Sequence, residues 1–293
     1  MTTVALILNP STVDDAAATT DLVERRCMAA GWDKVSVRHT TPDDPGTTAA
    51  RDAVAEGAEL VLCSGGDGTL AATAAGLLHS GVPMGILSSG TGNLLSRNLE
   101  IPLDLEAALT VALGGNTRLI DVGHVAGHTF VVMAGIGFDA TVMAEASGSL
   151  KARLGWLAYV IAGLKSLSTT PMNVTITLDD TETVVHRRAR TVLVGNVGQL
   201  QGGLPLLPDA DPSDGILDVI VIAPHTLADW ATTVWRIVRR GTTTDERLQR
   251  FRARRVELHT RHPHPRQFDG EVLPPSRSLH ADVDAAALLV KVP

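Results

Sequence analysis

The residues with the clearest chemical potential form a glycine-rich segment with one aspartate, Gly65-Gly66-Asp67-Gly68-Thr69. It follows the apolar run Val61–Cys63, which is typical of a buried parallel strand, and it precedes an Ala- and Leu-rich run with helical composition. Because glycine carries no Cβ atom, several amides at such a corner can point at one anion, and the positive end of the following helix adds to the attraction. A tight turn is the structural alternative, but it needs only one or two glycines. The segment therefore predicts a phosphate-binding loop.

Asp67 adds a metal ion to this prediction. Its carboxylate would repel bound phosphates unless a divalent cation lay between them, so Asp67 implies Mg²⁺ that is contacted directly or through water. No Lys follows the last glycine, which excludes a Walker A loop.

A second glycine-rich corner, Gly90-Thr91-Gly92-Asn93, follows the predicted strand Pro83–Leu87 and precedes another helix-like segment. In open parallel sheets, ligands bind beyond the carboxyl ends of the strands. Asn9 and Thr40 follow two further predicted strands, so we expect them at the same edge as both glycine corners. Two such corners at successive strand ends bracket one cleft.

Two acidic segments lie in the C-terminal half. Pro208–Asp218 places several carboxylates in a Pro- and Gly-containing loop, which is either an oxygen cage for a hard cation or an ordinary acidic turn. Asp269-Gly270-Glu271 places two carboxylates around one glycine. General-base chemistry on a hydroxyl needs one carboxylate within reach of its proton, whereas a polar hairpin turn is the structural alternative.

The elements that must position the first group of residues alternate between strand and helix. This alternation predicts a doubly wound parallel sheet covered on both faces, in an α/β nucleotide-binding domain over residues 1–122. The predicted strands are 4–8, 34–39, 59–63, 83–87 and 117–121, and the main predicted helices are 14–30, 47–57 and 105–113.

The pattern changes after Gly123, where β-like runs lack regular helical crossovers. We predict a mostly antiparallel β-sandwich domain over residues 123–293, with helices at 140–167 and 227–240. Its predicted strands are 130–133, 173–178, 183–194, 216–222 and 255–260. Gly135–Ala140 fits a dinucleotide-binding pattern, but no acidic residue follows at the distance that would hold a ribose, so hydride chemistry is not expected.

The composition of 293 residues, with a net charge of −7 and two cysteines, indicates a globular protein of the reducing cytoplasm and argues against nucleic-acid binding. We expect no signal peptide and no membrane span.

Two stretches leave alternatives open. Arg236–Arg255 has eight Arg against two acids, which suits a solvated face or a surface that docks on anionic lipid headgroups. Trp156–Leu164 suits packing against the domain or contact with acyl chains.

These segments together resemble the diacylglycerol kinase catalytic-domain family, which includes bacterial lipid kinases and relatives of sphingosine and ceramide kinases. They occur in family order over nearly the whole chain. The matching segments are Asn9-Pro10, Gly65–Thr69, Gly90–Asn93, Ile120–Gly123, Gly135–Asp139, Asp214–Asp218 and Asp269–Glu271. The family fold is an α/β nucleotide domain joined to a β-sandwich domain, and its C-terminal end often returns to the first domain, as Leu288–Val292 would do here.

The resemblance implies an ATP-dependent transferase that phosphorylates a lipid hydroxyl, with diacylglycerol as the default substrate and sphingoid bases, ceramide and phosphatidylglycerol left open. It also implies peripheral association with the membrane surface and a role in phospholipid metabolism; a homodimer stays open. ATP would contact Asn9, Thr40 or Thr41, Gly65, Gly66, Asp67, Gly68, Thr69, Gly90, Thr91 and Asn93. Asp67 and Asp121 would serve the catalytic Mg²⁺, whereas Asp211, Asp214 and the carbonyl of Ile216 would hold a second, structural Mg²⁺. Glu271 would take the proton from the lipid hydroxyl, with Asp269 beside it.

Two departures from the family pattern leave other functions open. Leu94 stands where the family commonly has Asp, which removes one carboxylate from the metal network, and the segment after Asn9-Pro10 lacks the usual glycine and basic residues. The alternatives are an NAD kinase, which shares the first glycine corner, and a non-catalytic relative that senses nucleotide or lipid.

Overall fold

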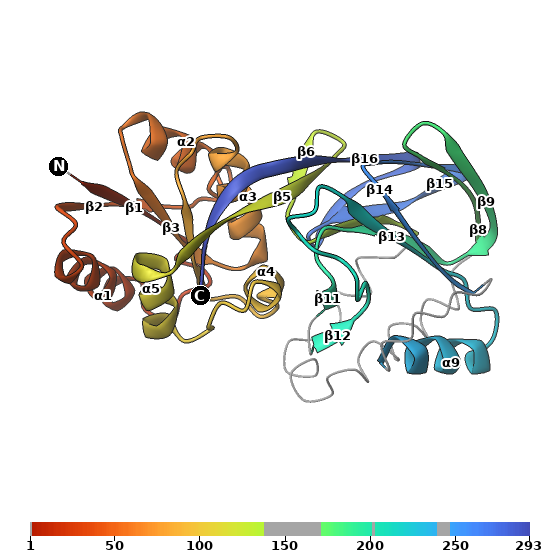
Figure 1. Ribbon diagram of the computed structural model, residues 1–293, viewed down its shortest axis with the longest axis horizontal. Helices are drawn as coiled ribbons and strands as arrows, with labels where there is room; N and C mark the ends of the chain where they lie inside the picture. Colours follow the sequence, from red (N-terminus) through yellow and green to blue (C-terminus); the bar gives the residue numbers. More distant parts are fainter. Residues whose placement is uncertain (1, 138–170, 201–202, 239–246) are drawn as a thin grey trace. The chain divides into compact units, whose positions relative to one another are not determined.

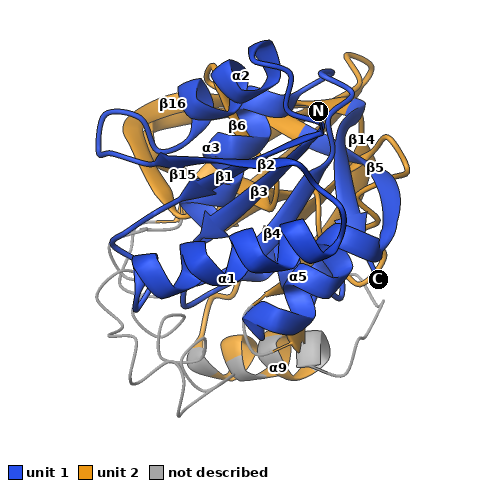
Figure 2. Cartoon of the chain, turned by 90° about the vertical axis from the view of Figure 1, so that its left-hand side faces the viewer, with its two compact units in different colours: residues 1–122, 285–293 blue, residues 123–284 orange. Residues whose placement is uncertain are grey.

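The structure is a computed structural model that describes residues 2–137, 171–200, 203–238 and 247–293 (Figure 1). The chain divides into two compact units, coloured separately in Figure 2. Unit 1 comprises the residues up to Val122 together with Ala285–Pro293, and unit 2 comprises Gly123–Asp284. The chain therefore passes between the units twice.

Unit 1 is an α/β unit in which β4, β3, β1 and β2 lie side by side in that order, and all of these pairs are parallel. The C-terminal end of the chain joins this sheet, because Val290 pairs with Met84 of β4. The elements are β1 (Thr3–Leu8), α1 (Ala16–Ala29), β2 (Lys34–His39), α2 (Thr47–Ala55), β3 (Leu60–Gly65), α3 (Asp67–Leu77), β4 (Met84–Ser88), α4 (Leu94–Asn98) and α5 (Leu105–Gly114).

Local sequence explains much of this unit. All six residues of β3 are buried, as its apolar run requires of a strand with neighbours on both sides. The side chains of Asp15 and Asp104 accept the amides of Ala18 and Ala107, so both aspartates cap the helices that follow them, α1 and α5. The predicted parallel sheet of the first domain is confirmed.

Unit 2 is built mainly from antiparallel strands. Its sheet has the order β14-β13-β10-β7-β15-β16, with β8 paired to β15 and β9. The elements are β5 (Asn116–Val125), β6 (His128–Phe130), β7 (Met133–Ile136), β8 (Met172–Leu178), β9 (Glu182–Ala189), β10 (Thr191–Gly195), β11 (Gln199–Leu200), β12 (Leu204–Pro205), β13 (Leu217–Ile222), α9 (Leu227–Val238), β14 (Leu248–Ala253), β15 (Arg255–Phe268) and β16 (Glu271–Val292). Strands β5 and β16 begin or end in unit 1 and carry the two passages of the chain.

The core of unit 2 comes from the inward side chains of these alternating strands, among them Val174, Ile176 and Val256. Strand β15 changes its partner along its length. Residues 256–260 pair with β8, residues 266–268 pair with β7, and the pairing with β16 has register shifts between His259 and Arg266. Such bulges bend a sheet, and here they bring the C-terminal end of β15 to β7. The predicted antiparallel β domain is confirmed.

Two predicted strands were wrong in detail. The run 130–133 is not one strand, because β6 ends at Phe130 and β7 begins at Met133. The run 183–194 is two strands, β9 and β10, and Arg188 near their junction has a positive φ of 65°. Apolar composition could not show either break. The predicted helices at 140–167, the apolar stretch 156–164, and Phe138, Asp139 and Ala140 lie outside the described residues. Among the helices that the structure describes, none is long and apolar enough to cross a membrane.

Candidate active site

The first glycine corner joins β3 to α3. Gly66 caps α3 in an extended conformation and Asp67 is the first helical residue, so the amides of the corner lie at the positive end of the helix. A Cβ atom added to Gly65 would lie 2.5 Å from Cβ of Thr69. This corner therefore requires a residue without a side chain because Thr69 packs against it, and its role in anion binding stays a prediction.

The second corner packs directly against the first. The amide of Ser89 donates to the carbonyl of Gly65 over 2.9 Å, which couples the ends of β4 and β3. A Cβ atom on Gly90 would lie 2.7 Å from Cα of Gly66, so the two backbones touch at this point. Asn93 has a left-handed conformation with φ of 50°, and its Oδ1 accepts the amide of Gly90 over 3.0 Å. The two corners form one continuous glycine-lined surface.

Asn9 follows β1 at the same edge and is tied to the first corner. Its Nδ2 donates to Oγ1 of Thr69 over 3.0 Å, and its backbone amide donates to the carbonyl of Ser64 over 2.9 Å. Thr40 and Thr41 follow β2; Thr40 is buried, whereas Thr41 is exposed. The structure thus brings Asn9 and the glycine corners together, and it places both threonines at the end of the strand next to β1.

Asp67 faces the second corner. Its Oδ1 accepts the amide of Leu94 over 2.7 Å, and a Cβ atom on Gly92 would lie 2.6 Å from its Oδ2. Burial raises the pKa of Asp67, although the backbone amides of Leu94, Leu95 and Asn93 and the charge of Arg97 act in the opposite direction. The backbone of Leu94 therefore contributes to the site, even though its side chain departs from the family pattern.

A magnesium ion bound to substrate phosphates commonly has one or two protein carboxylates among its ligands. Asp67 fits this role because it is a partly buried carboxylate at the glycine-lined surface. Asp121 is 2% exposed, and its Oδ1 accepts the amide of Ala286 over 2.7 Å. That bond holds the returning C-terminal segment at a residue with a positive φ of 51°. Asp67 is thus better suited than Asp121 to direct contact with a metal ion.

The acidic loop before β13 is paired with an arginine from β14. Asp214 forms an ion pair with Arg252, whose Nε also lies 3.6 Å from Oδ1 of the buried Asp218. Burial raises the pKa of Asp218 to about 6, and the charge of Arg252 opposes this rise. Oδ1 of Asp211 accepts the amide of Ser213. Within the described residues no group of three or more His, Cys, Asp or Glu side chains is arranged to hold a metal ion. Arg252 thus competes with the second Mg²⁺ that we predicted at Asp211, Asp214 and Ile216, which stays a prediction.

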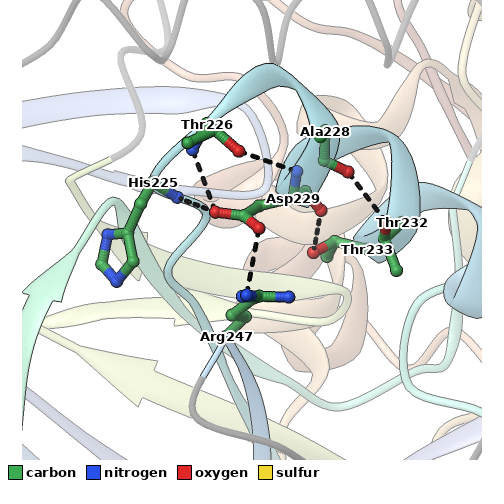
Figure 3. Close-up of polar contacts among 7 residues, drawn as sticks. All are labelled: His225, Thr226, Ala228, Asp229, Thr232, Thr233 and Arg247. Carbon is green, nitrogen blue, oxygen red and sulfur yellow. Dashed lines mark hydrogen bonds and ion pairs between the residues drawn. The ribbon is translucent and has the colours of Figure 1, made fainter.

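Arginines of the segment 236–255 have further acidic partners. Figure 3 shows Asp229 in the first turn of α9, where its Oδ2 accepts the amides of His225 and Thr226 and its Oδ1 lies 3.2 Å from Nη2 of Arg247. Nη1 of Arg255 lies 2.7 Å from Oδ2 of Asp180. Together with the Arg252 pair, these contacts give acidic partners to three of the eight arginines of this segment, and docking on anionic lipid headgroups stays a prediction.

Glu271 and Asp269 lie at the hairpin between β15 and β16. Glu271 is exposed and pairs with Phe268 across the hairpin. Asp269 is half-buried, and its carboxylate accepts the amides of Val131, Val132 and Met133. The two neighbouring acids therefore have different surroundings, which their spacing in the sequence did not show. Sequence reasoning also missed the pairing of Arg252 with Asp214 and the bonds from the amides of residues 131–133 to Asp269. No local sequence pattern indicates contacts between residues so far apart in the chain.

The chain matches two family models that together span most of its length. The diacylglycerol kinase catalytic domain matches residues 3–125, and the YegS C-terminal NAD kinase beta sandwich-like domain matches residues 131–291. A diacylglycerol kinase from Bacillus subtilis (strain 168) is 30% identical over 247 residues, which cover 83% of this chain and 80% of the relative. A probable lipid kinase YegS-like from Pseudomonas fluorescens (strain Pf-5) is 33% identical over 254 residues, which cover 86% and 83%.

Solved structures share the fold. A crystal structure titled as a diacylglycerol kinase from Bacillus anthracis str. Sterne has a TM-score of 0.75 at 21% identity, covering 99% of this chain and 97% of that one. An NAD kinase from Archaeoglobus fulgidus, solved in complex with ATP, has a TM-score of 0.52 at 11% identity and covers 99% and 93%. At these identities the likeness extends to the fold alone.

Proposed function

Because this chain belongs to the diacylglycerol kinase family of lipid kinases, we propose that it transfers the γ-phosphoryl group of ATP to the hydroxyl group of diacylglycerol. The observation that carries the proposal is the contact between the two glycine corners, where Gly66 and Gly90 meet at the carboxyl ends of β3 and β4. The product would be phosphatidic acid, and the reaction would belong to phospholipid metabolism.

Unit 1 would bind the nucleotide. The amides of Gly65–Thr69 and the positive end of α3 favour phosphate oxygens, and Asn9 holds Thr69 in place at the same edge. Thr40, Thr41, Thr91 and Asn93 would complete the contacts around the nucleotide. Mg²⁺, when bound, would neutralise charge on the phosphates, with Asp67 as its contact and Asp121 acting through water.

Unit 2 would prepare the acceptor. The carboxylate of Glu271 would take the proton of the lipid hydroxyl while the oxygen of that hydroxyl bonds to the γ-phosphorus and the bond from phosphorus to the β–γ bridging oxygen breaks. ADP leaves with the electrons of that bond. Phosphoryl transfer depends mostly on positioning and charge neutralisation, so one carboxylate that orients the acceptor is sufficient.

The test is a transfer assay with γ-labelled ATP and a panel of acceptors: diacylglycerol, a sphingoid base, ceramide, phosphatidylglycerol and NAD. We expect label in the organic phase as phosphatidic acid, with at least tenfold less in any other product. Label that appears mainly in NADP would support the NAD kinase alternative instead. Nucleotide binding without turnover of any acceptor would point to a sensing role.

We also propose that unit 2 contacts anionic membranes through the bent part of the β15–β16 hairpin. Arg261, His262 and Arg277 are exposed there, and among the described residues no carboxylate pairs with either arginine. The hydroxyl of Thr260 lies 2.8 Å from the carbonyl of His262 and 3.1 Å from that of Arg277, so the two segments are held together. Val272, 60% exposed, adds an apolar contact on the same hairpin.

This membrane contact predicts the behaviour of one double variant. Each basic residue near an anionic surface contributes about 1 kcal/mol, so Arg261→Gln with Arg277→Gln should weaken binding to phosphatidylglycerol vesicles about tenfold or more. Co-sedimentation measures the effect, with phosphatidylcholine vesicles as the uncharged reference. Arg25→Gln with Arg51→Gln is the control, because it removes the same charge from exposed positions on α1 and α2. Equal losses in the two double variants would contradict this surface.

A further inference from the structure

Asp269 makes an unusual set of contacts for a residue beside a proposed general base. Its Oδ2 accepts the amide of Val131 over 2.7 Å, and its Oδ1 accepts the amides of Val132 and Met133 over 3.0 and 2.9 Å. Its own amide donates to the carbonyl of Met133 over 2.8 Å. One side chain and its backbone therefore hold three consecutive residues that lie between β6 and β7.

The segment that Asp269 holds is itself anchored from the other side. Asn196 donates from its backbone amide to the carbonyl of Val132 over 2.9 Å, and from Nδ2 to the carbonyl of Val131 over 3.2 Å. Val131, Val132 and Met133 are all buried, which fixes their backbone within unit 2. Asp269 is thus attached to a rigid part of the fold.

The same residue defines the turn that carries Glu271. Asp269 and Gly270 have φ values of 43° and 90°, and Phe268 pairs with Glu271, which is the geometry of a two-residue hairpin turn of type I′. The amide of Gly270 donates to Oε1 of Gln267 over 3.1 Å. The ring of Phe268 stacks on His128 with centroids 4.7 Å apart. These contacts fix the hairpin turn, and Glu271 follows it as an exposed residue.

We propose that Asp269 is a positioning residue, which fixes the direction of Glu271 by clamping the hairpin turn to the amides of residues 131–133. The inference rests on the proposed role of Glu271 as the base. A carboxylate has about four lone-pair positions, and three amides already occupy three of those of Asp269, so its oxygens mainly hold backbone. Removing the carboxylate of Asp269 would leave the buried amides of residues 131–133 without an acceptor. This costs folding free energy and loosens the segment.

The test compares Asp269→Asn with Asp269→Gly. Asn-Gly and Gly-Gly are both favoured in type I′ turns, so both variants keep the turn conformation and change only the carboxylate. Asparagine retains one oxygen that can accept two of the three amides, whereas glycine retains none. We expect kcat to fall about tenfold in Asp269→Asn and about a hundredfold in Asp269→Gly, with an unchanged KM for ATP and an unchanged acidic limb of the pH profile. Equal losses in the two variants, together with loss of that limb, would assign proton transfer to Asp269 and overturn the proposal.

Asp179 provides a matched control. It also has a positive φ, of 49°, at a hairpin turn of unit 2, and its Oδ1 accepts the amides of Arg254 and Arg255 over 2.8 and 2.9 Å. Asp179→Gly removes a comparable clamp far along the chain from Glu271, so it should leave kcat within twofold of the wild type. A similar loss of kcat in Asp179→Gly would show that any loosened turn lowers activity, and it would contradict a specific role for Asp269.

A second readout does not depend on activity. Amide hydrogen exchange of residues 131–133 should become at least tenfold faster in Asp269→Gly than in the wild type, and should stay unchanged in Asp179→Gly. This result would support the clamp even if the protein transferred no phosphoryl group to any lipid, which separates the failure of the proposed function from the failure of this inference. Unchanged exchange in Asp269→Gly would overturn the clamp itself.

Discussion

Glu271→Gln is expected to lower kcat for lipid phosphorylation by about 10²–10⁴-fold, because the amide keeps the size of the side chain and cannot accept the proton of the lipid hydroxyl. Glu271 is exposed at the start of β16, so the substitution disturbs no buried contact, and folding should be retained. ATP affinity, measured by calorimetry, should stay within twofold, since the proposed nucleotide contacts all belong to unit 1. The measurement is the initial rate of label transfer at saturating ATP and lipid.

The control for this variant is Glu182→Gln, which removes the same charge from an exposed position on β9. It should keep the wild-type rate. Full activity of Glu271→Gln would remove Glu271 from the role of base. A parallel loss of ATP binding would instead place Glu271 among the groups that hold the nucleotide.

Gly90→Ala is expected to weaken ATP binding at least tenfold. The added Cβ atom would lie 2.7 Å from Cα of Gly66 and 3.1 Å from Oδ1 of Asn93, so the backbones of the two corners would have to separate. Overpacking of this kind costs about 1–3 kcal/mol, and here the displaced atoms are the ones proposed to bind phosphate. Equilibrium binding of ATP measures the effect directly, without any lipid.

A graded series makes the Gly90 prediction specific. A Cβ atom on Gly66 would have its nearest neighbour at 3.4 Å, and one on Gly114 would have none within 4 Å. We therefore expect the loss of ATP affinity to decrease from Gly90→Ala to Gly66→Ala, with no loss in Gly114→Ala. An ATP affinity of Gly90→Ala equal to that of Gly114→Ala would show that the contact between the corners does not support nucleotide binding.

The fold of unit 1 could be predicted because its signals are local. A buried strand such as Leu60–Gly65 has a continuous apolar run, and the glycines after it mark the corner without reference to any other part of the chain. The parallel arrangement then follows from the alternation of strands and helices, and it brings the ends of β1, β3 and β4 to one edge. The predictions from the sequence therefore agree best with the structure in the part of the site that depends on backbone geometry.

Sequence patterns were least informative where a backbone or side-chain group finds its partner far away in the chain. The run 130–133 has the composition of one strand, but the amides of Val131 and Val132 go to Asp269 instead of a neighbouring strand. The arginines of 236–255 form a basic run in the sequence, yet Arg247, Arg252 and Arg255 lie against acids from other elements. Composition counts charges and cannot assign their partners.

The sequence by itself determined the alternation of elements, the two glycine corners and the presence of an acid at each candidate position. Only the tertiary structure decided which donors each acid meets, since Asp269 and Val131 are separated by 138 residues and meet through packing of the sheet. Glu271, two positions further on, pairs with Phe268 and is exposed. Hydrophobic periodicity and glycine content report local backbone conformation, whereas a carboxylate's role depends on which donors the folded chain brings within about 3 Å of it.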